Sequence, residues 1–174
     1  MELFWINFMR IAHIFAGVLW VGAAVVYLFY IGPSVRATSP GSGQFMQHLI
    51  TRQKYPLFMN VVSAVTILAG AALYWIDSGG NITGWVKTGP GLGFTIGSVT
   101  AFAVYLLGFF LIRPRGERMG KLGSQIAAAG GPPSPLHIVE MQKINQELHT
   151  LEWIDFILLS IALVMMATAR YWLF

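Results

Sequence analysis

Four long stretches of mainly apolar residues constrain this chain more than any other feature of its sequence. A helix needs about 20 such residues to cross a hydrocarbon core about 30 Å thick. The sequence predicts helices over about residues 4–31, 55–77, 91–113 and 137–173. We therefore expect an all-α integral membrane protein, a four-helix bundle that forms a single domain over residues 1–174. We expect it to be a multi-pass protein of the cell (inner) membrane.

Proline, glycine and charge mark the expected ends of these helices. The pair Gly32-Pro33 is expected to end the first helix, and Arg113-Pro114 to end the third. We expect the segment from 116 to 135 to be the most mobile part, because it closes on a run rich in Ala, Gly and Pro. Apolar residues then recur at helical spacing, which predicts that the fourth helix extends beyond the membrane on the cytoplasmic side.

The composition agrees with a lipid-facing exterior. Only 10% of the residues are charged, whereas about 25% is usual in soluble domains. The chain has no cysteine, which excludes disulfides, thiolate metal sites, iron–sulfur clusters and haem attached through a Cys pair. The formal charge of +4 lies mainly in two connecting segments, so it indicates membrane topology and argues against nucleic-acid binding.

Basic residues predict the orientation, because cytoplasmic loops of membrane proteins collect Lys and Arg. Most lie in the first and third connections: Arg36, Arg52, Lys54, Arg113, Arg115, Arg118, Lys121 and Lys143. The opposite side has little beyond Lys87 and Arg170. We therefore expect the N- and C-termini to be extracytoplasmic and the two basic connections to be cytoplasmic.

The first candidate site lies in the first helix, where Arg10, His13, Gly17 and Trp20 follow one helical face. Ionisable side chains are costly inside a bilayer, which makes them candidates for function. A His can bind haem iron, and a cation one turn away suits the haem propionates. We expect haem b here, bound by His13 with Arg10, Gly17 and Trp20 around it. The alternative is an Arg that extends to the interface and a His that bonds a nearby carbonyl.

The pattern of His13, six residues, Trp20, one residue and Gly22 resembles the first helix of a group of four-helix membrane proteins. That group includes the CopD copper-resistance proteins, the HemJ-type protoporphyrinogen oxidases and the membrane domain of PuuD-type urate oxidases. The chain is also similar to the HemJ type in four later positions: Arg52, Tyr55, Pro56 and Gly70. The resemblance covers roughly the first 76 residues in detail. It implies a haem ligand at His13.

The resemblance stops at the third helix. HemJ-type proteins have a Lys and a His associated with that helix, and residues 91–113 contain neither. The other histidines, His48, His137 and His149, are expected at the cytoplasmic end, far from His13. A thioether from Met165 or Met166 in the outer half of the fourth helix can supply a second axial ligand, or these residues can serve only as packing.

A second candidate site lies at the start of the apolar part of the fourth helix, where His149, Glu152 and Asp155 recur every three residues. These groups can gather a metal ion or relay protons. The alternative is a solvated helix end. It applies least to Asp155, because this residue lies deepest in the apolar segment. In the third helix, Gly93 and Gly97 belong to a small-residue stripe that favours close helix packing or leaves room for a flat macrocycle.

The sequence leads to a first hypothesis and two alternatives. The first is a b-type haem-binding redox or electron-transfer component that exchanges electrons with quinone or other membrane redox subunits. The alternatives are a non-catalytic accessory subunit of a larger membrane complex and a copper or small-solute transport protein. A homodimer is a further possibility, because it can bring two His13 residues together. Whether the chain is an enzyme stays open.

Overall fold

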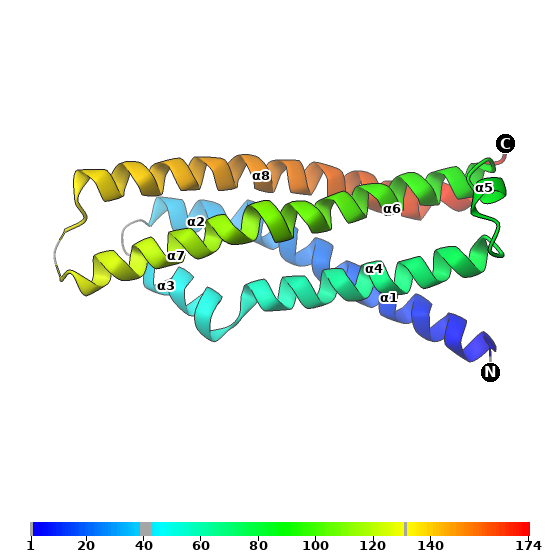
Figure 1. The fold of residues 1–174 in the computed structure, drawn as a ribbon, viewed down its shortest axis with the longest axis horizontal. Coiled ribbons are helices and arrows are strands. Elements are labelled where there is room, and N and C mark those ends of the chain that lie inside the picture. The colour runs from blue at the N-terminus through cyan, green and yellow to red at the C-terminus, as the bar shows by residue number, and fades with distance from the viewer. Residues whose placement is uncertain (1, 39–42, 131) are drawn as a thin grey trace.

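Four long helices lie side by side in the computed structural model of the chain, which describes residues 2–38, 43–130 and 132–174. They are α1 (Glu2–Val26), α4 (Tyr55–Asp77), α6 (Gly89–Leu107) and α8 (Pro135–Thr168). Figure 1 shows both chain ends at one end of the molecule, which we call the terminal end. The described residues contain no strand, so the predicted all-α class is confirmed.

Short elements join or prolong these helices. They are three π-helical turns, a 3₁₀ turn and four short or peripheral α-helices, namely η1 (Tyr27–Ile31), α2 (Gly32–Ala37), α3 (Gly43–Gln47), η2 (His48–Arg52), α5 (Ile82–Trp85), η3 (Gly108–Ile112), α7 (Arg113–Ala128) and η4 (Ala169–Tyr171). Several of them continue a long helix without a break. The resulting rods Glu2–Ala37, Tyr55–Asp77, Gly89–Ile126 and Pro135–Tyr171 are long and apolar enough to cross a membrane, which confirms the four predicted membrane-capable helices.

Two of the predicted helix ends are wrong, because neither Pro33 nor Pro114 stops its helix. A π-helical turn precedes each proline. The N–H of Gly32 donates to the carbonyl of Tyr27, and the N–H of Arg113 donates to that of Gly108, five residues back in each case. These wider turns let a proline sit in the first turn of the next helical segment, where its missing N–H is tolerated.

The segment from 116 to 135, predicted to be the most mobile part, is largely helical in the described residues. Helix α7 runs on to Ala128, and α8 begins at Pro135, where the side chain of Ser134 accepts a hydrogen bond from the N–H of His137 at 3.3 Å. The fourth helix therefore starts well before its apolar part, as predicted. Residue 131 lies outside the described residues.

The centre of the bundle is a cluster to which each long helix contributes one buried side chain. These are Trp20 of α1, Val62 of α4, Val104 of α6 and Leu159 of α8. Val104 is 1% exposed. Away from this cluster the helices associate as two pairs, α1 with α4 and α6 with α8. The space between the two pairs is where the candidate site lies.

Glycines bring α6 and α8 close together. A β-carbon at Gly93 would lie 2.8 Å from the β-carbon of Ala169, and one at Gly97 would lie 3.3 Å from that of Met165. The N–H of Gly89 donates to the carbonyl of Phe174 at 2.9 Å, so the chain end lies against the start of α6. The small-residue stripe at Gly93 and Gly97 therefore serves close helix packing.

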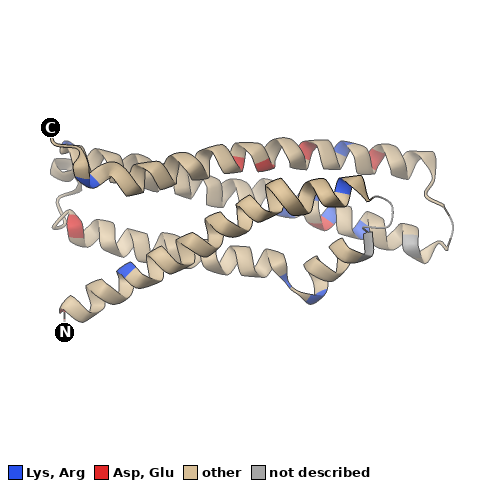
Figure 2. Cartoon of the chain, turned by 180° about the vertical axis from the view of Figure 1, so that it is seen from behind, with Lys and Arg blue, Asp and Glu red and all other residues tan. Residues whose placement is uncertain are grey.

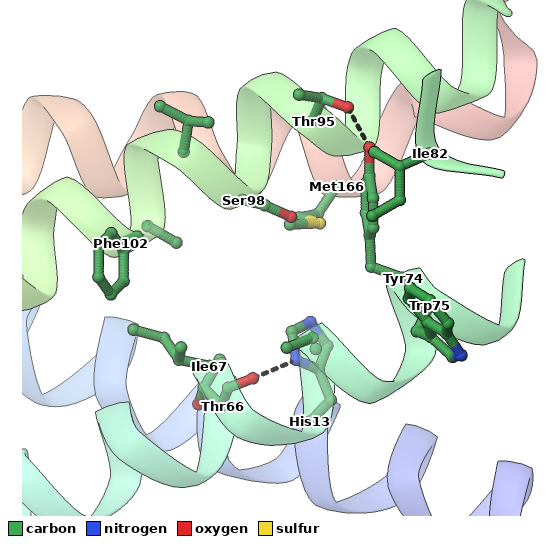
Figure 3. Close-up of a pocket in the computed structure, with 14 residues that line it drawn as sticks. His13, Thr66, Ile67, Tyr74, Trp75, Ile82, Thr95, Ser98, Phe102 and Met166 are labelled. Atoms are coloured by element: carbon green, nitrogen blue, oxygen red, sulfur yellow. Dashed lines mark hydrogen bonds between the residues drawn. The ribbon is translucent and has the colours of Figure 1, made fainter. Parts of the chain in front are cut away.

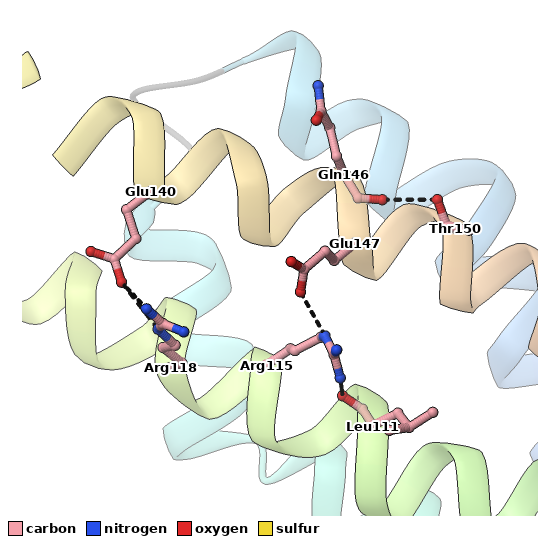
Figure 4. Close-up of polar contacts among 7 residues, drawn as sticks. All are labelled: Leu111, Arg115, Arg118, Glu140, Gln146, Glu147 and Thr150. Carbon is pink, nitrogen blue, oxygen red and sulfur yellow. Dashed lines mark hydrogen bonds and ion pairs between the residues drawn. The ribbon is translucent and has the colours of Figure 1, made fainter. Parts of the chain in front are cut away.

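Most of the charged residues lie in the half of the molecule away from the terminal end, as Figure 2 shows. There α7 lies along the first turns of α8 (Figure 1). Nε of Arg115 lies 2.8 Å from Glu147, and a terminal nitrogen of Arg118 lies 2.6 Å from Glu140 (Figure 4). These ion pairs are partly exposed and therefore weak, because water screens them. Both connect α7 to α8.

The glycine contact yields a stability prediction. We expect Gly93→Ala to destabilise the bundle by about 1–3 kcal/mol, because its β-carbon overlaps Ala169. Gly108→Ala is the matched control, since a β-carbon there has open space around it. Thermal unfolding in one detergent would compare both variants with the wild type. Equal midpoints for all three proteins would contradict the close contact.

Candidate functional site

His13 is held in one orientation between α1 and α4. Its Nδ1 lies 2.7 Å from the main-chain oxygen of Thr66, 53 residues away along the chain. This bond to a main-chain carbonyl is the one that the alternative without a cofactor predicted for His13. Because a carbonyl oxygen can only accept a hydrogen bond, the geometry assigns the proton to Nδ1. The other ring nitrogen, Nε2, then carries a free lone pair in the neutral imidazole. Figure 3 shows the second nitrogen directed away from α4 into the space below α6.

Gly70 leaves space for the imidazole of His13, because it has no side chain. A β-carbon at residue 70 would lie 2.8 Å from Cε1 and 2.9 Å from Nδ1 of His13. Contacts that short force one of the groups to move. A glycine one turn beyond Thr66 therefore lets the ring reach the Thr66 carbonyl. The resemblance had singled out Gly70, and the structure shows its role in this chain.

A cavity of about 450 Å³ opens beside His13, between the two helix pairs. This volume falls in the range of about 300–1,000 Å³ that is typical of sites for organic ligands. The walls are mainly apolar, with a few polar groups from α1, α4 and α6: His13, Thr66, Tyr74, Thr95 and Ser98. One residue of α8 in the described part of the lining, Met166, also reaches it.

A hydrogen bond between hydroxyl groups joins α4 to α6 at the terminal side of this cavity. The hydroxyl of Thr95 donates to the carbonyl of Gly91 at 2.6 Å. The Tyr74 hydroxyl lies 2.6 Å from the same Thr95 oxygen, and it must be the donor because Thr95 has only one hydroxyl proton. Figure 3 shows this contact above the aromatic ring of Trp75.

The other three residues predicted to bind the cofactor lie around the cavity and outside its described lining. Arg10 is one turn from His13 toward the terminal end, 3.9 Å from the carboxylate of Asp77. Gly17 faces Thr66, whose methyl group would lie 3.6 Å from an added β-carbon. Trp20 is buried in the central cluster. The structure thus places His13 in the cavity, Arg10 near its terminal end, and Gly17 and Trp20 in the packing of α1.

Apart from Gly70, which the resemblance had named, sequence reasoning missed the α4 side of the site. Thr66, Gly70 and Tyr74 follow one another at steps of four, and all three line the cavity. This spacing of a small residue between two hydroxyl-bearing residues was present in the sequence as one helical face. Nothing local to α4 indicated that this face lies against His13, because the contact depends on how α1 and α4 pack.

The second predicted site does not form a metal centre in the described residues, which contain no group of three or more His, Asp and Glu side chains able to hold a metal ion. His149, Glu152 and Asp155 all lie on α8. His149 Nδ1 and Glu152 Oε2 are buried without a hydrogen-bond partner among those residues. The charge of Glu152 interacts with that of Arg36 in α2. The three residues lie where the charged first half of α8 meets its apolar second half.

Comparison of the chain with known proteins produced no match to a family model, a curated protein or a solved structure. The resemblance to the CopD, HemJ and PuuD group therefore stays a prediction. The functional argument rests on the cavity, the orientation of His13 and the donor groups around it.

The contact between Gly70 and His13 yields a second prediction. We expect Gly70→Ala to displace the imidazole from Thr66 and to cost about 1–3 kcal/mol of stability. Gly17→Ala, with an ordinary contact of 3.6 Å, should preserve both the stability and the ring position. Nitrogen NMR of the labelled His13 ring would report whether the proton stays on Nδ1. An unchanged His13 signal in Gly70→Ala would contradict the proposed contact between the His13 ring and Gly70.

Proposed function

We propose that this protein binds b-type haem in the cavity between the two helix pairs, with His13 as an axial ligand, and that it acts as a redox or electron-transfer component of the membrane. One observation carries the proposal. The Nδ1 proton of His13 is committed to a main-chain carbonyl at 2.7 Å, and Nε2 is left free beside a cavity. Histidines that bind metals commonly donate their other ring N–H in this way, which fixes the tautomer and the ring orientation.

The donor groups support a haem over a bare metal ion. A haem supplies four nitrogen ligands to its iron and asks the protein for one or two axial ligands only. Among the described residues, the cavity lining contains one imidazole and one thioether, His13 and Met166, and no carboxylate. A volume of about 450 Å³ with mainly apolar walls suits a flat organic group and far exceeds what an ion needs.

Arg10 and the Tyr74–Thr95 contact have separate roles in this proposal. Arg10 lies one helical turn from His13, in a position to neutralise a haem propionate, and its guanidinium is 3.9 Å from the carboxylate of Asp77. The hydroxyl bond at 2.6 Å between Tyr74 and Thr95 holds α4 to α6 and so maintains the separation of the two walls. The haem supplies one-electron chemistry, while these residues bind it, orient it and keep water away.

The electron partner is expected in the membrane. Helices α1, α4, α6 and α8 expose large apolar side chains over most of their length, which fits direct contact with lipid. A quinone dissolved in the bilayer, or another membrane redox subunit, can approach such a surface. We place the termini on the extracytoplasmic side, because the basic residues gather in the other half (Figure 2).

One observation favours copper as a second candidate. His13 and Met166 share the cavity, and nitrogen and thioether donors suit Cu(I). The same residues would then serve a copper transport protein. Only two such donors lie in the described lining, which is fewer than a closed copper site uses, so haem remains the first proposal.

The haem proposal predicts a visible spectrum. Full-length protein purified after expression with haem supplied should show the α-band of b-type haem in a dithionite-reduced minus oxidised spectrum. His13→Ala should lose the band, because it removes the free Nε2. His48→Ala is the matched control, since His48 is exposed on η2 and bonds Gln53 at 3.2 Å. Metal analysis of the same samples would separate iron from copper.

Each alternative has its own result in that experiment. A colourless, folded wild-type protein with bound copper that disappears in His13→Ala would replace the haem proposal by the copper one. A colourless protein without either metal would leave the accessory subunit and small-solute transport as the remaining hypotheses. A haem band of equal height in the wild type and His13→Ala would show that another residue binds the iron.

The absence of native cysteine allows a direct test of orientation. We expect a membrane-impermeant maleimide to label Lys87→Cys in intact cells, and to label Lys54→Cys only after the membrane is opened. Both lysines are exposed, so access to the reagent depends on the side of the membrane. The reverse pattern would invert the proposed topology and leave the fold unchanged.

A further inference from the structure

We infer that the haem of the proposed function has an open sixth coordination position, and that a small diatomic gas such as carbon monoxide, nitric oxide or dioxygen binds there beside the hydroxyl of Ser98. This inference rests on the proposed function, because His13 must hold the iron from one side. Three features of the cavity support it: a free hydroxyl group on the far wall, the lack of a second ligand near His13 in the described lining, and an opening to the outer surface.

Ser98 has the one free hydroxyl group in the described lining of the cavity. The hydroxyls of Thr66 and Thr95 donate to main-chain carbonyls of their own helices at 2.8 and 2.6 Å, and the hydroxyl of Tyr74 donates to Thr95. The hydroxyl of Ser98 has no hydrogen-bond partner among the described residues. Figure 3 shows Ser98 on the side of α6 that faces the cavity. A proton donor is therefore available on the wall across from His13.

The described lining offers no second ligand close to His13. Proteins bind haem iron through His, Met, Cys thiolate or Tyr. His13 is the sole imidazole there, and the chain has no cysteine. The hydroxyl of Tyr74 is bonded to Thr95 at 2.6 Å. Met166 lies on the opposite wall and packs against α6, since a β-carbon at Gly97 would lie 3.0 Å from its Cε. An iron bound to His13 therefore keeps its other axial position open.

The α6 wall of the cavity is reachable from the outer surface. Val99 and Phe102 both line the cavity, yet they are 63% and 48% exposed. They belong to the apolar rod Gly89–Ile126, so the surface around them is expected to face lipid. Ions and strongly polar molecules enter hydrocarbon at a high cost in free energy, whereas an uncharged diatomic gas does not. A gas dissolved in the bilayer can therefore reach the open position.

A free hydroxyl beside the open position can donate a hydrogen bond to a bound diatomic ligand. The alternative is that Ser98 serves only the close packing of the small-residue stripe in α6. The two roles differ in a measurable way. A hydrogen bond to the oxygen of carbon monoxide on the reduced iron weakens the C–O bond and lowers its stretching frequency. A serine that only packs leaves this frequency unchanged.

The test compares haem-loaded full-length wild type with Ser98→Ala and Thr100→Val, which each remove one hydroxyl group from α6. Thr100 is the matched control, because its hydroxyl donates to the carbonyl of Ile96 at 2.8 Å and it lies outside the described lining of the cavity. The measurements are haem content, spin state of the oxidised protein by electron paramagnetic resonance, carbon monoxide binding to the reduced protein, and the infrared frequency of the C–O stretch.

We expect all three proteins to be high-spin when oxidised and to bind carbon monoxide stoichiometrically when reduced. The C–O stretch should shift to higher frequency in Ser98→Ala and stay at the wild-type frequency in Thr100→Val. A low-spin wild type that does not react with carbon monoxide would overturn the open position and leave the haem proposal in place. Equal frequencies in all three proteins would overturn the role of Ser98. Failure of the wild type to bind haem under any condition would instead reject the proposed function, and with it this inference.

Discussion

The inability of lipid to hydrogen-bond the backbone is the constraint on which this structure depends. Each segment within the bilayer must satisfy its own N–H and C=O groups, which leaves long helices as the form available to these sequences. Beyond the apolar segments, a π-helical turn before Pro33 and before Pro114 lets each helix continue past its proline. Lipid is as apolar as the helices, so their association depends on close packing.

Close packing is distributed unevenly in this bundle, and the candidate site follows from that. Gly93 and Gly97 bring α6 against α8, and Gly70 leaves room on α4 for the His13 ring of α1. The pairs meet at the cluster around Trp20 and Val104 and separate beyond it toward the terminal end. Each helix packs tightly against the other member of its pair, and a cavity is left between the two pairs.

The site is organised by one long-range contact, the hydrogen bond of 2.7 Å from His13 to Thr66. It connects residues 53 positions apart, fixes the imidazole tautomer and depends on Gly70 for space. By contrast, the predicted grouping of His149, Glu152 and Asp155 rested on spacing along one helix. Such spacing places side chains on a common face, but metal binding needs further donors from neighbouring helices, and the described residues provide no such group.

The sequence by itself determined the helical class and the four membrane-capable segments, because these follow from hydropathy. It also singled out His13 as a candidate, because a polar group in lipid is costly. It also placed the ends of α4 correctly, since Tyr55 and Asp77 border an uninterrupted apolar run. Only the tertiary structure decided which carbonyl His13 bonds, that Met166 shares its cavity, and that Pro33 and Pro114 lie within continuous helices. The physical reason is that these features depend on contacts between helices and on a choice of hydrogen-bond register, which local composition does not fix.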